Sequence, residues 1–173
     1  MTSKLAFEIG GAKGHLVQRT KYPYVPHAGM EFSLDRAARF DLSLRIPAWA
    51  GARTAVAVNG KRLHAEIAPG RFFTINREWK NGDRLDVEFA MPLRLEAVDP
   101  QHPDLVAPVW GPLALFMLEG APAIIGKKAL TAIRQSAEGS AEWTANAAAG
   151  KLRLKPFADI GTETYRLYNR TSS

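Results

Sequence analysis

Residues 40–47 read Phe-Asp-Leu-Ser-Leu-Arg-Ile-Pro, and this stretch is the clearest indication of the fold class. Apolar and polar side chains alternate along it, which is the period of two expected for a β-strand with one buried face. The even-numbered residues from 40 to 46 are predicted to face a core, whereas Arg45 and its odd-numbered neighbours face away. Pro47 ends the strand because it has no backbone N–H to donate.

Turn signals divide the following residues into further strands. Asn59-Gly60 lies between two apolar runs, and because both residues tolerate positive φ, a tight hairpin is predicted there. Pro69-Gly70 and Asn81-Gly82-Asp83 predict two more turns. Apolar residues then occupy the odd-numbered positions from 85 to 95, which predicts one long strand with these side chains facing the core.

Short strands, frequent turns and little helical periodicity predict an all-β protein with an antiparallel β-sandwich of the jelly-roll kind. A polar, proline-rich loop follows at residues 99–104 and suggests a module boundary. We therefore expect one sandwich module at residues 1–98 and a second, smaller all-β module packed on it at residues 99–173. The alternative is one continuous sandwich over residues 1–173.

Two segments in the C-terminal half carry less decisive patterns. Residues 127–138 fit both a short helix and a strand, and a strand is the favoured interpretation. Residues 151–157 alternate basic and apolar side chains, which predicts an edge strand with Lys151, Arg153 and Lys155 pointing outward.

Composition excludes several classes of protein. The chain has 173 residues and no cysteine, so disulfides and thiolate metal sites are excluded. The formal net charge is +6, but the basic residues are scattered rather than clustered, so nucleic acid is not an expected partner. The most apolar stretch, residues 105–118, is too short for a membrane span, and no signal peptide is visible. We expect a soluble protein, cytoplasmic by default.

Five strings in the chain occur in the order known from one protein family. They are FDLSLRIPAW at 40–49, VNG at 58–60, PGRFF at 69–73, WKNGD at 79–83 and WGPLAL at 110–115. Together they resemble the C-terminal β-sandwich region of the β-L-arabinofuranosidase-like glycoside hydrolases, a family first catalogued as a domain of unknown function. The resemblance extends over most of the chain and implies the same sandwich fold.

The resemblance implies a non-catalytic role. Catalysis in that family is assigned to a separate helical barrel, where a cysteine nucleophile sits among the cysteine and glutamate ligands of a zinc ion. This chain has no cysteine, so those roles have no position here. The resemblance therefore implies an accessory region with no catalytic residue, metal or cofactor of its own. Its expected partner is a helical-barrel catalytic domain, in the same polypeptide or in another.

Other partners and roles stay open. A homodimer and a carbohydrate ligand are both compatible with the resemblance. The alternative function is a free-standing carbohydrate-binding module or a protein-interaction module. An upstream reading frame for the barrel would favour the accessory role, whereas an isolated gene would favour a free-standing module.

Aromatic side chains are the main candidates for a site, because sugars stack their apolar faces on flat rings. Trp49, Trp79, Trp110 and Trp143 are the candidate carbohydrate-binding residues, although a ring that plugs the end of a sandwich explains them as well. Arg45 is either solvated or an interface partner for an acidic group. The histidines and carboxylates show neither metal-ligand spacing nor a glycosidase pair beyond what exposed strand faces explain.

Overall fold

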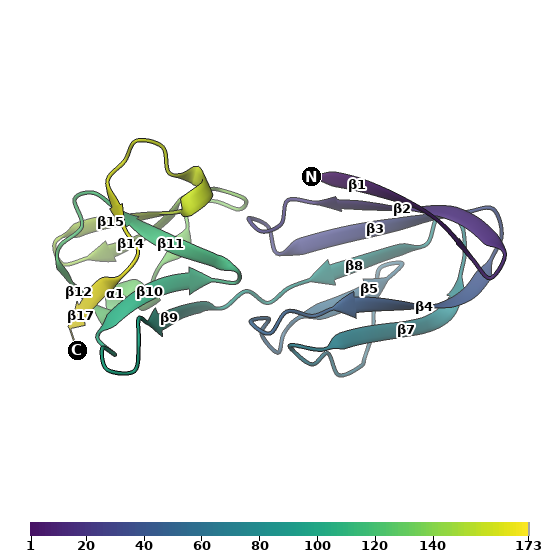
Figure 1. Ribbon diagram of the computed structural model, residues 1–173, viewed down its shortest axis with the longest axis horizontal. Coiled ribbons are helices and arrows are strands. Elements are labelled where there is room, and N and C mark those ends of the chain that lie inside the picture. The colour runs from purple at the N-terminus through teal and green to yellow at the C-terminus, as the bar shows by residue number, and fades with distance from the viewer. Residues whose placement is uncertain (173) are drawn as a thin grey trace. The chain divides into compact units, whose positions relative to one another are not determined.

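The computed structural model describes residues 1–172, and the chain divides into two compact units, one over residues 1–91 and the other beginning at Pro92. Both units consist mainly of β-strands, and nearly all neighbouring strands are antiparallel (Figure 1). The predicted all-β, antiparallel fold class is confirmed. The division between the units lies at Met91 rather than after residue 98, because β9 (Leu93–Ala97) pairs with β10 (Leu105–Trp110) of the second unit.

A six-stranded sheet and a two-stranded sheet make up the N-terminal unit. The larger sheet contains, in spatial order, β1 (Thr2–Ile9), β2 (Ala12–Thr20), β3 (His27–Leu34), β8 (Arg84–Glu88), β5 (Ala55–Val58) and β6 (Lys61–Arg62). The smaller sheet pairs β4 (Ala38–Arg45) with β7 (Phe72–Trp79). Buried side chains from both sheets form one hydrophobic cluster, so the two sheets pack face to face as a sandwich.

Aromatic rings dominate that hydrophobic cluster. Trp79 is fully buried, with its ring centroid 4.5 Å from Phe32 and 5.9 Å from Phe40. Its indole Nε1 donates a hydrogen bond to the Phe40 carbonyl at 3.2 Å, so the polar atom of this ring is also satisfied. The register predicted for β4 is confirmed, since Phe40, Leu44 and Ile46 are buried and Leu42 is half-buried.

The predicted Asn59-Gly60 hairpin is confirmed. It joins β5 to β6, and both turn residues have positive φ, 51° for Asn59 and 74° for Gly60. These angles fit a tight two-residue turn, whose twist matches that of the flanking strands. Local chemistry therefore fixes this hairpin.

A buried carboxylate ties the hairpin to the turn before β8. Asp83 is 7% exposed and accepts hydrogen bonds from the Asn59 side-chain amide at 2.7 Å and the Lys80 backbone amide at 2.9 Å. Arg77 Nη2 lies 3.3 Å from Asp83 Oδ2, the oxygen that also accepts from Lys80. Burial alone would raise the pKa of Asp83, but the hydrogen bonds from Asn59 and Lys80 and the charge of Arg77 outweigh it and hold the pKa below its usual value.

The prediction of a single long strand over residues 85–95 is wrong. β8 ends at Glu88 and β9 begins at Leu93, so the run is divided between the two units. Pro92 lies in the gap, where it removes a backbone donor and restricts the residue before it. Within β8 the predicted face is correct, because Leu85 and Val87 are both buried.

The C-terminal unit forms one nine-stranded sheet. Its main path runs β12 (Ile124–Gly126), β17 (Asn169–Ser172), β10, β11 (Leu113–Leu118), β15 (Gly150–Pro156), β14 (Trp143–Ala147) and β13 (Arg134–Gln135). β9 pairs with β10, and β16 (Tyr165–Arg166) pairs with β11. β12 and β17 are parallel, an exception to the antiparallel pairing seen elsewhere.

Two expectations for this unit need correction. The favoured strand at residues 127–138 is instead the helix α1 (Lys127–Thr131) followed by β13, because Leu130 packs inward at helical spacing. The expected edge strand at 151–157 is an interior strand, since β15 lies between β11 and β14. Its apolar residues are buried while Lys151 and Arg153 are exposed, so the alternation reports a buried face rather than an edge.

Helices contribute little to the fold. Apart from α1, the described residues include one short 3₁₀ segment, η1 (Phe157–Asp159). No helix within residues 1–172 has the length and apolar character needed to cross a membrane.

Candidate functional site

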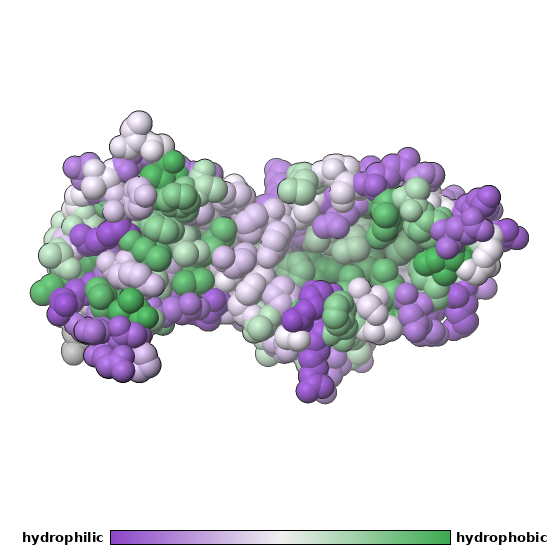
Figure 2. Space-filling view, in the orientation of Figure 1, coloured by the Kyte–Doolittle hydropathy of each residue, from purple (hydrophilic) through white to green (hydrophobic). Residues whose placement is uncertain are grey.

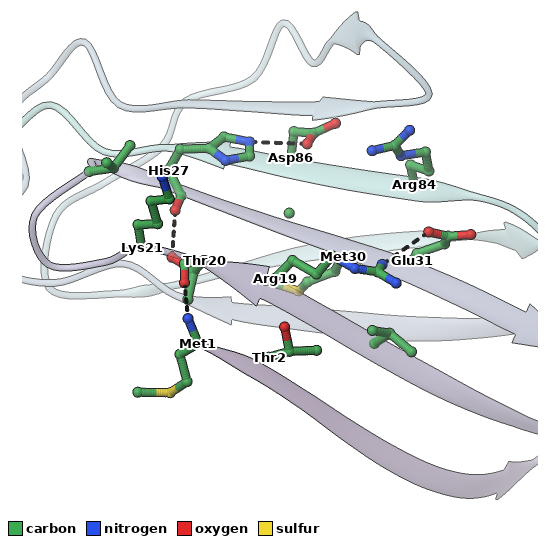
Figure 3. A pocket seen from close by; sticks show the side chains of 13 residues that line it. Met1, Thr2, Arg19, Thr20, Lys21, His27, Met30, Glu31, Arg84 and Asp86 are labelled. Carbon is green, nitrogen blue, oxygen red and sulfur yellow. Dashed lines mark hydrogen bonds and ion pairs between the residues drawn. The ribbon is translucent and has the colours of Figure 1, made fainter. Parts of the chain in front are cut away.

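A hollow of about 420 Å³ lies over β2, β3 and β8 on the face of the six-stranded sheet that points away from β4 and β7 (Figure 3). The buried residues of β3 and β8, such as Phe32 and Val87, point to the opposite face. We call the hollow the outer-face pocket. Its charged or titratable side chains are Arg19, Lys21, His27, Glu31, Arg84 and Asp86.

Strand register places Gly29 at the centre of this set. Gly29 lies opposite Arg19 on β2 and opposite Asp86 on β8. Along β3, the next residues on the same face are His27 and Glu31, because side chains alternate between the two faces of a strand. A position without a side chain is therefore surrounded on four sides by charged or polar groups.

Two pairs of side chains flank the pocket (Figure 3). The His27 Nε2 and Asp86 Oδ1 atoms lie 3.1 Å apart, and the Arg19 Nη1 and Glu31 Oε2 atoms lie 3.4 Å apart. All four side chains are at least one-third exposed. Pairs at this exposure contribute little to stability, so their hydrogen-bonding capacity remains usable by a ligand.

Gly29 is unusual because nothing in its backbone calls for glycine. Its φ does not lie in the positive region that side chains avoid. A Cβ there would lie 3.4 Å from Asp86 Oδ1 and 3.4 Å from His27 Cε1, so a methyl group would just fit. Glycine inside a strand costs about 0.5–1 kcal/mol relative to alanine, and it often marks close approach of a ligand or another backbone.

A second hollow, of about 250 Å³, opens between the two sheets of the N-terminal unit. We call it the inner-face hollow. Its lining includes the apolar residues Met30, Val87 and Phe89, with Tyr22 beside them. Figure 2 shows hydrophobic surface gathered in the N-terminal unit where Figure 1 draws β3, β8 and β4. Burial raises the pKa of Tyr22 above its ordinary value.

The four predicted tryptophans fall two in each unit, and burial separates their roles. Trp79 and Trp143 are core residues with no ring face open to a sugar. Trp49 is half-buried, stacked on Tyr22 with ring centroids 6.5 Å apart. Trp110 is half-buried against Trp143 at 5.3 Å. Only Trp49 and Trp110 therefore keep part of the ring available for the predicted stacking.

Arg45, the predicted interface residue, is exposed at the end of β4. Its guanidinium donates to the Ile46 carbonyl at 2.9 Å and lies 5.6 Å from the ring centroid of Phe72. Within residues 1–172 it forms no ion pair. It also borders the inner-face hollow, where its charge remains available to an acidic partner.

Sequence reasoning missed an exposed aromatic cluster in the C-terminal unit. Phe157 is 62% exposed and Tyr165 is 45% exposed, and both rings contact Phe116 with centroids 5.5 Å away. These residues come from η1, β16 and β11, so no periodic pattern connects them. Sequence reasoning also missed Gly29, whose only signal was a glycine inside an otherwise strand-like run.

The described residues do not accommodate the zinc centre that the resemblance assigns to the catalytic barrel. In residues 1–172, no three histidine or acidic side chains lie close enough together to hold a metal ion. The sequence contains no cysteine to serve as nucleophile or zinc ligand. No step of a zinc-cysteine mechanism is assigned to this chain.

Solved structures of glycoside hydrolases share this fold. A GH127 β-L-arabinofuranosidase from Geobacillus stearothermophilus T6 superimposes with a TM-score of 0.81 at 21% identity, covering 98% of this chain and 32% of that one. A protein described as a glycoside hydrolase gives 0.77 at 20%, covering 98% and 34%. A GH127 β-arabinofuranosidase gives 0.71 at 21%, covering 99% and 34%. The chain thus has the fold of one part of such enzymes and spans about a third of their length.

The family follows from the N-terminal unit. Residues 1–91 match the family model described as β-L-arabinofuranosidase, GH127 middle domain. Because this match takes in 91 of the 173 residues, the chain belongs to that family. The matched model describes a middle domain, which corrects the expectation of a C-terminal region. No curated protein matches the chain.

Proposed function

We propose that the chain is a non-catalytic accessory region of a β-L-arabinofuranosidase-like glycoside hydrolase, and that it supports a helical-barrel catalytic domain outside these 173 residues. One observation carries the proposal. The similar structures cover 98–99% of this chain, whereas the chain spans only 32–34% of theirs. A complete match to one third of an enzyme is expected of a supporting region, and the middle-domain match agrees with it.

The chemistry of the chain supports a non-catalytic role. The family resemblance requires a cysteine nucleophile and cysteine ligands, and the chain has no cysteine. The most conspicuous carboxylates already have partners: Asp83 is fixed by Asn59 and Arg77, and Glu163 accepts from Lys155 Nζ at 2.6 Å. These contacts hold both carboxylates within turns of the fold.

Exposed apolar side chains supply a surface on which another domain can pack. In the N-terminal unit Phe72 is 67% exposed and Leu5 is 61% exposed, and in the C-terminal unit Phe157 and Tyr165 form the aromatic cluster described above. A region separated from its neighbour exposes part of the former interface. Arg45 beside Phe72 adds a charge that an acidic residue of the partner can meet.

Hydrolysis is the direct test of the proposed function. We expect purified chain to release no nitrophenol from 4-nitrophenyl β-L-arabinofuranoside above the buffer rate. Glu31→Gln and Asp86→Asn serve as matched variants, because both carboxylates border the outer-face pocket. Hydrolysis by the unaltered chain that either variant abolishes would overturn the non-catalytic assignment.

The size of the native gene product tests the accessory role separately. An antibody raised against this chain should detect, in an extract of the native host, a polypeptide about three times as long, since the chain covers 32% of the Geobacillus enzyme. A helical barrel produced as its own polypeptide should instead co-precipitate with this chain. Detection of the chain at its own length, without such a partner, would favour a free-standing module.

A free-standing carbohydrate-binding module is the second candidate function. Trp49 supports it, since its half-buried ring stacks with Tyr22 beside the inner-face hollow. Titration with arabinose-containing oligosaccharides should then quench tryptophan fluorescence in a saturable way, and Trp49→Phe should abolish the change. A flat titration at millimolar sugar would leave this candidate without support.

A further inference from the structure

We propose that the outer-face pocket binds a neutral sugar, with Gly29 as its floor. This inference goes beyond the accessory role, because supporting a catalytic domain requires no ligand on this face of the sheet. It also differs from the tryptophan-based sugar site, since none of the four tryptophans lines the pocket.

Gly29 forms the floor of the pocket. Gly29 occupies an interior strand, between β2 and β8, where a side chain would add packing and reduce the entropy lost on folding. Its φ permits any residue, and its nearest neighbours would accept a methyl group. Neither backbone geometry nor crowding explains the glycine. What distinguishes this position is the open volume above Gly29, which a side chain would occupy.

The chemistry of the rim identifies the ligand. Arg19, Lys21 and Arg84 donate hydrogen bonds, Glu31 and Asp86 accept them, and His27 can do either. A sugar hydroxyl both donates and accepts, so it can be satisfied at every point of this rim. An anion would meet the two carboxylates, and a cation would meet the ammonium group of Lys21 and two guanidinium groups. The mixed rim therefore favours a neutral, hydroxyl-rich molecule.

Apolar side chains complete the match to a sugar. Val17 and Val25 line the same pocket as the charged groups. A sugar ring presents C–H faces as well as hydroxyls, and sites for such ligands combine apolar walls with a few placed polar groups. The volume of about 420 Å³ lies within the range of small-molecule sites and is sufficient for one or two sugar units.

The weak ion pairs on the rim make binding feasible. The Arg19–Glu31 and His27–Asp86 pairs are exposed, so exchanging one partner for a ligand hydroxyl loses little stability. The same exposure leaves the ligand partly in water, so binding should be weak, with a Kd of about 1 mM or higher. Weak, saturable binding is the behaviour to look for.

Nuclear magnetic resonance of the full chain labelled with ¹⁵N tests the proposal. L-Arabinose and a β-linked L-arabinofuranose disaccharide are added up to about 50 mM, a range chosen for a millimolar Kd. Saturable shifts should be confined to the amides of residues 1–2, 17–21, 25–31 and 84–86, which carry the pocket. The absence of saturable shifts for both sugars, or shifts centred on other residues, would overturn the proposal.

Substitution of the floor separates binding from folding. Gly29→Ala should weaken sugar binding at least fivefold while leaving the melting temperature unchanged or higher, because the methyl group fits but occupies the floor on which the sugar would lie. Gly126→Ala is the matched control, since Gly126 also has no positive φ and only Ser172 Oγ lies near its Cβ position, 4.0 Å away. Unaltered sugar affinity in folded Gly29→Ala protein would refute the assigned floor.

An anionic sugar distinguishes the predicted ligand class. D-Galacturonate should bind at least fivefold more weakly than a neutral sugar, because Glu31 and Asp86 oppose its carboxylate. Tighter binding of galacturonate would replace the neutral ligand with an anionic one and overturn the proposal. These outcomes are independent of the accessory role, which hydrolysis and the size of the native protein test.

Discussion

The two units of the chain differ in how their strands are joined into sheets: the first has two antiparallel sheets, and the second has one sheet that contains a parallel pair. In the N-terminal unit, β1, β2 and β3 follow one another in the sheet, and β4 pairs with β7 along its full length. In the C-terminal unit, the final strand β17 pairs with both β12 and β10, and β16 joins β11. Side-chain alternation reports which face is buried, but it carries no information about such distant partners.

Each unit nevertheless contains one fully buried tryptophan. Trp79 packs on Phe32 and Phe40 in the first unit, and Trp143 packs against Trp110 in the second. We therefore expect the hydrophobic cores of the two units to unfold independently of each other.

The largest effect is expected from removing these rings. Trp79→Ala should lower the free energy of unfolding of the N-terminal unit by about 3–5 kcal/mol, because it leaves a large cavity, and Trp143→Ala should do the same to the C-terminal unit. Hydrogen exchange followed by mass spectrometry resolves the two segments. Trp79→Phe is the milder control. Equal loss of protection in both units for either variant would show that they unfold as one.

The next effect concerns the carboxylate of Asp83. Asp83→Asn should destabilise the N-terminal unit by about 1–3 kcal/mol at neutral pH, because it weakens the bonds with Lys80 and Arg77 inside a nearly buried site. The pKa of Asp83 is lowered from 3.8, so its ionised form stabilises the fold above about pH 3.8, and this contribution is lost as the pH falls through the folded value.

Urea unfolding at several pH values checks this prediction. The difference between the unaltered chain and Asp83→Asn should be constant from pH 7 to about pH 5 and should shrink below about pH 4. Asp159, a half-buried residue of the C-terminal unit, provides a control, in which Asp159→Asn leaves the N-terminal unit unchanged. A difference that grows on acidification would mean that the carboxylate is not stabilised by its ionised form.

Glycines in two hairpin turns give the third comparison. Gly60 in the first unit has φ 74°, and Gly150 in the second has φ 122°, with no atom within 4 Å of either Cβ position. Backbone strain is therefore the only cost of alanine at these sites. Gly60→Ala should cost about 1 kcal/mol and Gly150→Ala about 2 kcal/mol, because φ near 120° is almost closed to side chains.

Thermal melts of both glycine variants measure these costs. Ala149→Gly, next to Gly150, is a control for altered chain entropy at the same turn. The ranking would be contradicted if Gly60→Ala were the more destabilising change.

The prediction from sequence succeeded where structure is local. The Asn59-Gly60 turn and the alternation of β4 were both identified, because turn chemistry and strand period act over a few residues. β15 was assigned to an edge because its basic face resembles one, although its neighbours β11 and β14 cover both sides. The partners of a strand are set by distant segments, which the pattern within the strand does not identify.

The candidate site was harder to predict than the fold. The tryptophans were chosen for their chemistry, yet the sequence does not separate Trp79 in the core from the half-buried Trp49. The outer-face pocket arises from the register of three strands around Gly29, so it becomes visible only when β2, β3 and β8 are aligned. The sequence does not identify Gly29 as the floor of a pocket, because the residues that surround it come from other strands.

The smallest effect should come from Glu163, the counterpart of Asp83 in the C-terminal unit. The hydrogen bond from Lys155, together with backbone amides that include Gly161, lowers the pKa of Glu163 from 4.5 to about 2. The ionised carboxylate therefore stabilises the fold above about pH 4.5, and the contribution is lost between there and about pH 2. Glu163 is partly exposed, so water screens the interaction and the effect should be smaller than that of Asp83.

Glu163→Gln should therefore lower the unfolding midpoint of the C-terminal unit slightly at pH 7, by less than Asp83→Asn lowers that of the N-terminal unit, and this effect should disappear as the pH falls through about 2. Glu138→Gln, at an exposed position of the same unit, is the matched control and should change neither midpoint. Chemical-shift titration of the Glu163 side-chain carboxyl measures its pKa directly. A value near 4.5, combined with a Glu163→Gln effect as large as that of Asp83→Asn, would mean that exposure does not separate the two carboxylates, and the contrast between the units would then need another cause.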